Sequence, residues 1–375
     1  MKRSTSAERW ALLAFGALLL SAVGSAAQNP TFTVRVLSNI SGGVVVYVSG
    51  INKAGEAVGS AGEGTSACPY NCAIIWHDGR PTVLEVEAEY GSQAIAINNA
   101  GQVVGEAYTA EILSPTAVVW NHGTPTFLPG PNPQYPQTYV NAINDAGNVV
   151  GEASEVNVNN PETEAIEWSG LTPTVLGTSP ACTDGRGVGV PTAINSDGII
   201  VGYTGGGHLC DEAVATVWRG TTAVLLGIGE PSAINNAGLI VGQSVATPGA
   251  TAWVDGVFTP LPGTSDLLES MATAVNNLGI IVGTIQGSDG GPPRIPPYHA
   301  VLWSSVSATP QDLNDLISTE DAAEYLLIEA TGINDGCTIV VNGYTRRHYA
   351  QAAFLLTPTD PSSCSNGVFL PTPKN

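Results

Sequence analysis

One phrase returns seven times along this chain, and the repetition constrains the fold more than any other feature. The phrase is an apolar residue, an Asn, two further residues and a Gly, followed by a pair of Val or Ile residues. Its copies lie 40 to 58 residues apart, and the seventh, Ile333–Gly336, reads as one residue shorter than the others. The recurring Asn is found at Asn52, Asn98, Asn144, Asn195, Asn235, Asn276 and Asn334.

Each copy of the phrase has the composition of a β-hairpin. Asn at the first turn position bonds its own backbone, Gly supplies a positive φ, and the β-branched pair suits a pleated strand. A further strand rich in small residues then ends in an aromatic residue, and a short Thr-x-Leu-like strand follows most copies. The aromatic residues are Trp76, Trp120, Trp168, Trp218, Trp253, Trp303 and, in the seventh copy, Phe354.

Four short strands in every repeat predict an all-β chain folded as a single seven-bladed β-propeller. A β-solenoid is the alternative, although its repeats are usually shorter. Helical periodicity is confined to residues 312–317. The segment Thr31–Leu37 has the character of the fourth strand of a blade, and we expect it to close the ring beside the seventh copy, which hides both edges. The tail segment Asn366–Phe369 is a second candidate for that position.

The N-terminus has the composition of a secretory signal peptide. Basic residues precede an apolar stretch, 11–23, that is too short to cross a bilayer comfortably, and small residues follow it. We expect residues 1–27 to be a signal peptide cleaved after Ala27, against the alternative of a membrane anchor. Residues 28–358 then form the propeller, and 359–375 form a tail tied back by a disulfide. No second stretch of about 18 apolar residues occurs, so no membrane span is expected.

These motifs resemble those of bacterial extracellular HAF-repeat proteins, which are named for a His-Ala-Phe motif. The nearest copy of the motif core is His299–Trp303, and Ala353–Pro358 resembles the closing phrase of the family. Asp312–Leu316 together with Gly332–Gly336 resembles its last repeat. The likeness covers essentially the whole chain after residue 27. It implies secretion and a repeat architecture, and it implies no established biochemical activity.

The chain is strongly acidic, with 12 Lys and Arg against 32 Asp and Glu and a formal net charge of −20. This balance argues against nucleic acid as a partner, because phosphates require basic faces. In a propeller the short Asn-Gly turns share one face, and the long, variable loops share the other, where binding residues concentrate. We therefore expect the acidic long-loop face to bind an unknown extracellular polymer or protein. The candidate ligand-binding residues on it are Glu85, Glu87, Glu89, Glu152, Glu155, Glu162 and Glu164.

Little in the sequence points to catalysis. The predicted innermost strands, which line the channel, end in segments without Asp, Glu, His, Lys, Arg or Cys, so we expect no titratable group on them and assign no catalytic residue. The five His residues are scattered and form no zinc motif. The seven Asn residues are interpreted as turn residues rather than as a ligand ring. The alternative function is a secreted propeller enzyme, a polysaccharide hydrolase or lyase, with carboxylates supplied by loops.

No cofactor is implied, although clustered carboxylates leave room for a divalent cation, and we expect a monomer. Six Cys residues in a secreted chain predict three disulfides. Four Cys residues fall on the long-loop face of the predicted propeller, and the two on the opposite face therefore pair with each other. Of the other four, one pair shares a single loop and the other flanks one hairpin of the fourth blade. The expected disulfides are Cys68–Cys72, Cys182–Cys210 and Cys337–Cys364.

Overall fold

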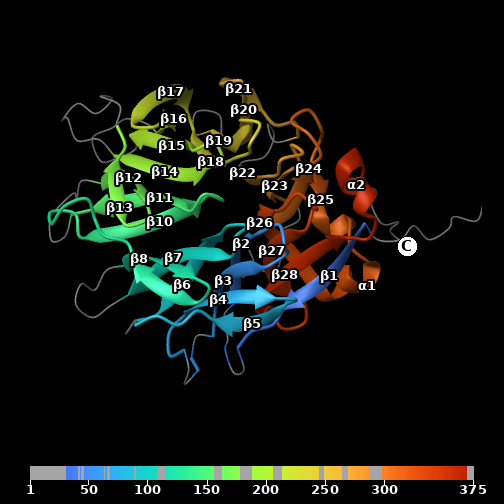
Figure 1. The fold of residues 1–375 in the computed structure, drawn as a ribbon. Helices are drawn as coiled ribbons and strands as arrows, with labels where there is room; N and C mark the ends of the chain where they lie inside the picture. Colours follow the sequence, from blue (N-terminus) through green and yellow to red (C-terminus); the bar gives the residue numbers. More distant parts are fainter. Residues whose placement is uncertain are drawn as a thin grey trace, which may run out of the picture.

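Seven sheets surround a central axis in the computed structural model of the chain (Figure 1). The structure describes residues 31–40, 43, 46–62, 64–65, 68–87, 90–108, 115–155, 163–177, 188–205, 213–244, 249–263, 269–287 and 298–369. Within these ranges every sheet is four-stranded and antiparallel, and the sheets are arranged as the blades of a β-propeller. The seven-bladed fold predicted from the repeats is confirmed. The predicted signal peptide lies outside the described residues.

Blades 1 to 6 each take four consecutive strands, and their first strands contact one another around the axis. The strands are β2 (Val46–Ile51), β3 (Ala57–Ala61), β4 (Cys72–His77) and β5 (Arg80–Val83) in blade 1; β6 (Ser92–Ile97), β7 (Gln102–Tyr108), β8 (Pro115–Asn121) and β9 (Thr124–Phe127) in blade 2; β10 (Gln137–Ile143), β11 (Asn148–Ser154), β12 (Thr163–Ser169) and β13 (Thr172–Val175) in blade 3; β14 (Gly189–Ile194), β15 (Ile199–Gly205), β16 (Ala213–Arg219) and β17 (Thr222–Ile228) in blade 4; β18 (Glu230–Ile234), β19 (Ile240–Ser244), β20 (Gly249–Val254) and β21 (Val257–Pro260) in blade 5; and β22 (Ser270–Val275), β23 (Ile281–Gln286), β24 (Tyr298–Trp303) and β25 (Gln311–Asp312) in blade 6.

The N-terminal strand completes blade 7. The sheet contains β26 (Tyr325–Ile333), β27 (Ile339–Thr345) and β28 (Gln351–Pro358), and β1 (Phe32–Leu37) pairs antiparallel with β28 along its whole length (Figure 1). Closure by the N-terminal strand is therefore confirmed. The alternative, closure by the C-terminal tail, is wrong, because Pro361–Asn366 forms helix α2 and the next three residues form no strand.

The connection between blades 6 and 7 carries the helical turns that the sequence predicts near residue 312. It contains the 3-10 helix η1 (Leu313–Asp315) and helix α1 (Thr319–Glu324). Asp312 caps η1, and its carboxylate oxygen Oδ2 lies 2.5 Å from the ring nitrogen Nδ1 of His299. Burial opposes ionisation of Asp312, but hydrogen bonds from His299 and Asn314 outweigh it and hold the pKa of the carboxyl below its usual value. His299, the histidine of the HAF-like motif, thus fixes a connection between blades.

A β-bulge interrupts the inner strand of every blade, and a glycine of the second strand packs against it. In blade 3 a Cβ on Gly151 would lie 1.9 Å from the carbonyl oxygen of Tyr139, so no larger residue fits there. This close approach explains why the second strand of each blade has Gly opposite the bulge. The equivalent glycines are Gly59, Gly105, Gly202, Gly242, Gly283 and Gly343.

The tryptophans that end the third strands are fully buried and join neighbouring blades. In blade 3 the indole Nε1 of Trp168 donates to the carbonyl of Pro129, which follows the outer strand of blade 2, at 2.8 Å. Four other tryptophans donate in the same way. Trp253 has no acceptor in the described structure. In the other blades with a tryptophan the acceptor carbonyl follows the outer strand of the preceding blade. The outer strand before Trp253, β17, runs for seven residues instead of the four seen in β5, β9 and β13, so the chain differs at this position.

The seventh Asn turn differs from the prediction that it is one residue shorter. Cys337 takes the place of the turn Gly, with a φ of +57°, and its amide donates to the carbonyl of Asn334 as Gly55 donates to Asn52. The length of the turn is therefore unchanged, and that prediction was wrong. The disulfide from Cys337 to Cys364 in α2 holds the residue in this disfavoured conformation.

Two of the three predicted disulfides are present in the described structure. Cys68 pairs with Cys72 in the loop between β3 and β4, and Cys337 pairs with Cys364. The second of these ties α2 back to the propeller, as expected for the tail. Cys182 and Cys210 lie outside the described residues, and their pairing stays a prediction that peptide mapping without reduction can check.

Candidate functional site

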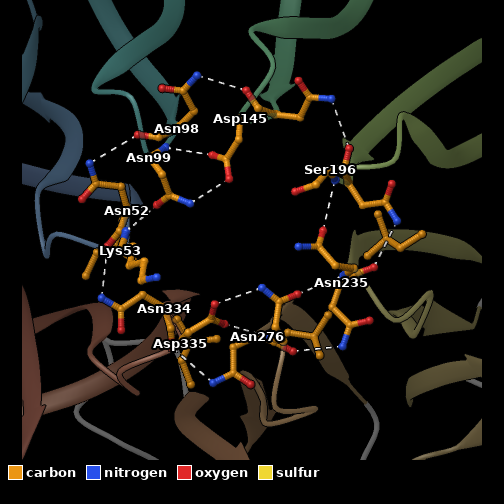
Figure 2. Close-up of a pocket in the computed structure, with 18 of the residues that line it drawn as sticks. Asn52, Lys53, Asn98, Asn99, Asp145, Ser196, Asn235, Asn276, Asn334 and Asp335 are labelled. Atoms are coloured by element: carbon orange, nitrogen blue, oxygen red, sulfur yellow. Dashed lines mark hydrogen bonds between the residues drawn. The ribbon is translucent and has the colours of Figure 1, made fainter.

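The face that carries the short turns, here called the short-turn face, contains a closed ring of seven asparagines, part of which is labelled in Figure 2. The side-chain amide Nδ2 of each Asn donates to the backbone carbonyl of the Asn in the next blade. The seven bonds are 3.0 to 3.3 Å long, and the last one, from Asn334 to Asn52, closes the circle. The ring therefore fastens every blade to both of its neighbours.

The same asparagines also build their own turns, as the sequence predicts. Oδ1 of Asn144, for example, accepts the backbone amides of Ala146 at 3.1 Å and Asn148 at 3.0 Å. Sequence reasoning recognised this role and missed the bonds between blades. A signal was present, because a turn alone accepts Asp, Ser or Gly at that position, whereas all seven copies have Asn.

A cavity of about 190 Å³ opens at the centre of this ring. The residues that follow the seven Asn form its rim. In five blades the backbone amide of the rim residue donates to a rim side chain of the next blade, at 2.8 to 3.0 Å. The side chains that accept these bonds belong to every rim residue except Lys53 and Ser196, so most rim side chains join neighbouring blades. The rim residues are Lys53, Asn99, Asp145, Ser196, Asn236, Asn277 and Asp335.

The opposite face, called the long-loop face, carries titratable groups at the ends of the inner strands. Glu230 lies in the inner strand β18, and Glu329 lies in the inner strand β26. The prediction that inner strands carry no titratable residue is therefore wrong. It rested on the strand segments next to the turns, whereas these carboxylates lie toward the other end. With nearby residues of other inner strands and of second strands they form a group that we call the Glu–Tyr belt. It comprises Tyr47, Glu106, Tyr108, Tyr139, Glu152, Tyr203, Glu230 and Glu329.

Burial raises the pKa of Glu106, Glu152 and Tyr108 in the belt. Glu106 is only 6% exposed, and burial raises the pKa of its carboxyl although Gln93 and Tyr108 donate hydrogen bonds to it. Burial likewise raises the pKa of Glu152, with a further contribution from the charge of Glu106 in the neighbouring blade. Burial and then the charge of Glu106 raise the pKa of Tyr108 to about 12. Carboxylates of two blades therefore interact at one end of the channel.

Neutralising Glu152 is expected to stabilise the protein at neutral pH. A carboxyl whose pKa is raised by folding makes its full contribution to stability below its ordinary pKa, 4.5, and loses it as the pH rises through the folded value. E152Q should therefore unfold at higher urea concentration than the parent at pH 7 and lose that advantage near pH 4. Urea denaturation across this range measures the difference. E85Q, at an exposed site, is the control, and an equal pH dependence in both variants would contradict the expectation.

The predicted ligand-binding residues occupy two parts of the long-loop face. Glu85 and Glu87 are exposed in the connection from blade 1 to blade 2. Glu152 and Glu164 lie at the same ends of β11 and β12, and Glu155 follows β11 and accepts Gln134 Nε2 at 2.6 Å. The structure therefore gathers the blade 3 residues and keeps them apart from the blade 1 pair. Glu89 and Glu162 lie outside the described residues.

A pocket of about 370 Å³ lies between the first of these carboxylate groups and the Cys68–Cys72 loop. Tyr70 lines it, and the ring of Tyr70 contacts that of Tyr90 at a centroid distance of 5.9 Å and an interplanar angle of 47°. Both tyrosines are about half exposed, at 48% and 46%. Glu85 is the one charged side chain among the lining residues that the structure describes. Sequence reasoning missed this pocket, because its walls come from two separate loops.

A second cavity between blades 1 and 2 brings two histidines together. It has a volume of about 450 Å³ and is lined by His77 and His122 among others, and Nδ1 of His77 lies 3.0 Å from Oε1 of Glu56. No motif in the sequence links these two histidines. In the described part of the chain, no group of three or more His, Cys, Asp or Glu side chains is arranged to hold a metal ion.

Comparison with known proteins adds no family. No protein-family model and no curated protein matches the chain. Among the described residues no helix has the length and apolar character needed to cross a membrane. The fold itself, a rigid ring that displays loops, fits a binding or scaffold module.

Proposed function

We propose that the protein is a secreted binding or scaffold propeller, of the kind that the HAF-repeat resemblance implies, and that its long-loop face engages a basic extracellular partner. The observation that carries the proposal is the unequal distribution of charge between the two faces. A surface of one sign raises the local concentration of oppositely charged partners and repels like-charged ones.

The long-loop face carries carboxylates from several blades of the described structure. They include the belt residues and the loop residues Glu85, Glu87, Glu155, Glu164, Glu320 and Glu324. The basic residues described on this face are Arg346 and Arg347. Nε of Arg346 already donates hydrogen bonds to the carbonyls of Ala322 and Tyr325. The short-turn face has Lys53, Arg80 and Arg219 in or next to its turns, together with fewer carboxylates, among them Asp78, Asp145, Asp197, Asp255 and Asp335.

Secretion is supported by two separate features. The two disulfides of the described structure suit an oxidising compartment, because cytosolic thiols are kept reduced. The N-terminal residues have the basic, apolar and small-residue order of a signal peptide.

A polymer-binding assay with matched charge variants tests the proposal. The purified protein should bind poly-L-lysine, bind neither dextran nor dextran sulfate, and release poly-L-lysine as the salt concentration rises. E87Q/E155Q/E164Q should weaken this binding at least fivefold. D78N/D197N/D255N, which changes the net charge equally on the short-turn face, should leave it within twofold. Binding to dextran sulfate, or equal effects of the two variants, would overturn the proposal, and repeating the assay with calcium tests the divalent-cation option.

The second candidate is a polysaccharide hydrolase or lyase, and the Glu–Tyr belt favours it. General acid catalysis is favoured by a carboxyl whose pKa lies above its ordinary value, and burial raises the pKa of both Glu106 and Glu152. Incubation with a panel of polysaccharides and measurement of new reducing ends tests this function. The activity should vanish in E106Q and persist in D197N, a change at an exposed turn of the opposite face.

A further inference from the structure

We infer that the pocket beside the Cys68–Cys72 loop takes a cationic side chain, lysine or arginine, of the basic partner. We call it the tyrosine pocket, and it is lined by Cys68, Pro69, Tyr70, Asn71, Cys72, Val83, Leu84, Glu85, Val86, Gly91 and Ser92. The inference rests on the proposed function, because it names where on the long-loop face a positive charge is held.

The tyrosine pocket is held in shape by several fixed contacts. The Cys68–Cys72 disulfide closes its loop, and the backbone amide of Ser92 donates to the carbonyl of Asn71 at 2.9 Å. Ser92 Oγ in turn accepts the amide of Ala73 at 2.9 Å. A Cβ on Gly91 would lie 2.7 Å from the Asn71 carbonyl oxygen, so the two loops touch along their backbones. A pocket fixed in this way binds without a large ordering cost.

The aromatic pair suits a cation. Tyr70 and Tyr90 contact each other at a tilt of 47°, and about half of each remains exposed, so ring surface is left uncovered beside the pocket. Aromatic faces attract ammonium and guanidinium groups within about 6 Å, and angled aromatic walls are a known way to hold such groups. Exposed aromatic side chains of this size also mark interaction sites.

The polar groups of the pocket call for a ligand that donates hydrogen bonds. Glu85 supplies a carboxylate, and no Lys, Arg or His is among the lining residues that the structure describes. Lysine and arginine side chains carry donors only, together with the positive charge that Glu85 and the exposed Glu87 attract. The volume of the tyrosine pocket, about 370 Å³, lies in the range of ligand-binding pockets.

Binding of a lysine dodecamer and an arginine dodecamer to tyrosine variants tests the inference. Y70A/Y90A should weaken binding of both peptides about tenfold, from the loss of two cation–aromatic contacts. Y70F/Y90F should retain binding, because the ring faces remain. Y349A removes an exposed tyrosine of the same face outside the pocket and should have less than a twofold effect. E85Q should weaken binding, whereas E324Q, with the same charge change elsewhere on this face, should do so less.

The outcomes separate this inference from the proposed function. If E87Q/E155Q/E164Q weakens peptide binding while Y70A/Y90A does not, the acidic face stands and the tyrosine pocket is overturned. If neither peptide binds the parent protein, both fall. Preferential binding of cellohexaose with loss in Y70F/Y90F would assign the pocket to a sugar and overturn a cationic ligand. Circular dichroism of each variant checks that the ring remains folded.

Discussion

Replacing Asn144 by Ala is expected to destabilise the folded protein by about 3–5 kcal/mol, because one buried side chain makes three hydrogen bonds. Its Oδ1 holds the two amides of its own turn, and its Nδ2 holds the carbonyl of Asn195 in blade 4 at 3.1 Å. Removing the side chain leaves all three backbone groups without that partner, the carbonyl of Asn195 in a buried position and the two amides in partly buried ones. Urea denaturation followed by tryptophan fluorescence measures the change.

A second substitution separates the two roles of this residue. N144D keeps the acceptor for the turn amides and removes the donor to Asn195, so it should cost about 1–2 kcal/mol. N121A, at an exposed position at the end of β8, is the control and should change stability by less than about 0.5 kcal/mol. If N144D matches the parent protein, the bond between blades contributes nothing. If N144D and N144A cost the same, the turn contributes nothing.

The number of blades and the closing strand could be read from the sequence because their signals are local. A hairpin turn, a buried Trp and a glycine opposite a bulge each depend on a few neighbouring residues, and each recurs with the repeat. The single turn that was misread, at Cys337, has a non-glycine residue at a positive φ. A disulfide to a residue 27 positions away supports that conformation, and no local pattern reveals it.

The site residues were harder to predict because the ring brings together segments far apart in sequence. Glu106 and Glu152 lie near the ends of second strands in different blades, whereas Glu329 lies in an inner strand. No regular spacing in the sequence therefore links the three residues. Their interaction follows only from the closed circle. The tyrosine pocket has the same origin, since Tyr70 and Tyr90 come from loops on either side of β4 and β5.

Replacing Phe32 by Ala is expected to open the ring at its closing strand, with a loss of about 3–5 kcal/mol. Phe32 is fully buried, its ring stacks on that of Phe369 at 5.6 Å, and its amide donates to the carbonyl of Leu316 at 3.0 Å. Loss of the side chain leaves a cavity where β1 joins blade 7. Urea denaturation measures the loss, and limited proteolysis should show earlier cleavage near residue 38, whose carbonyl binds the indole of Trp76.

A matched residue on the same strand decides whether packing or pairing holds β1 in place. Val36 pairs with β28 as Phe32 does, but its side chain is 41% exposed, so V36A should change stability by less than about 1 kcal/mol. The double variant F32A/F369A should cost less than the sum of the single variants by about 0.5–1.5 kcal/mol, because each single change already removes the stacked pair. If F32A costs no more than V36A, backbone pairing alone closes the propeller, and the buried aromatic contact with the C-terminal tail is dispensable.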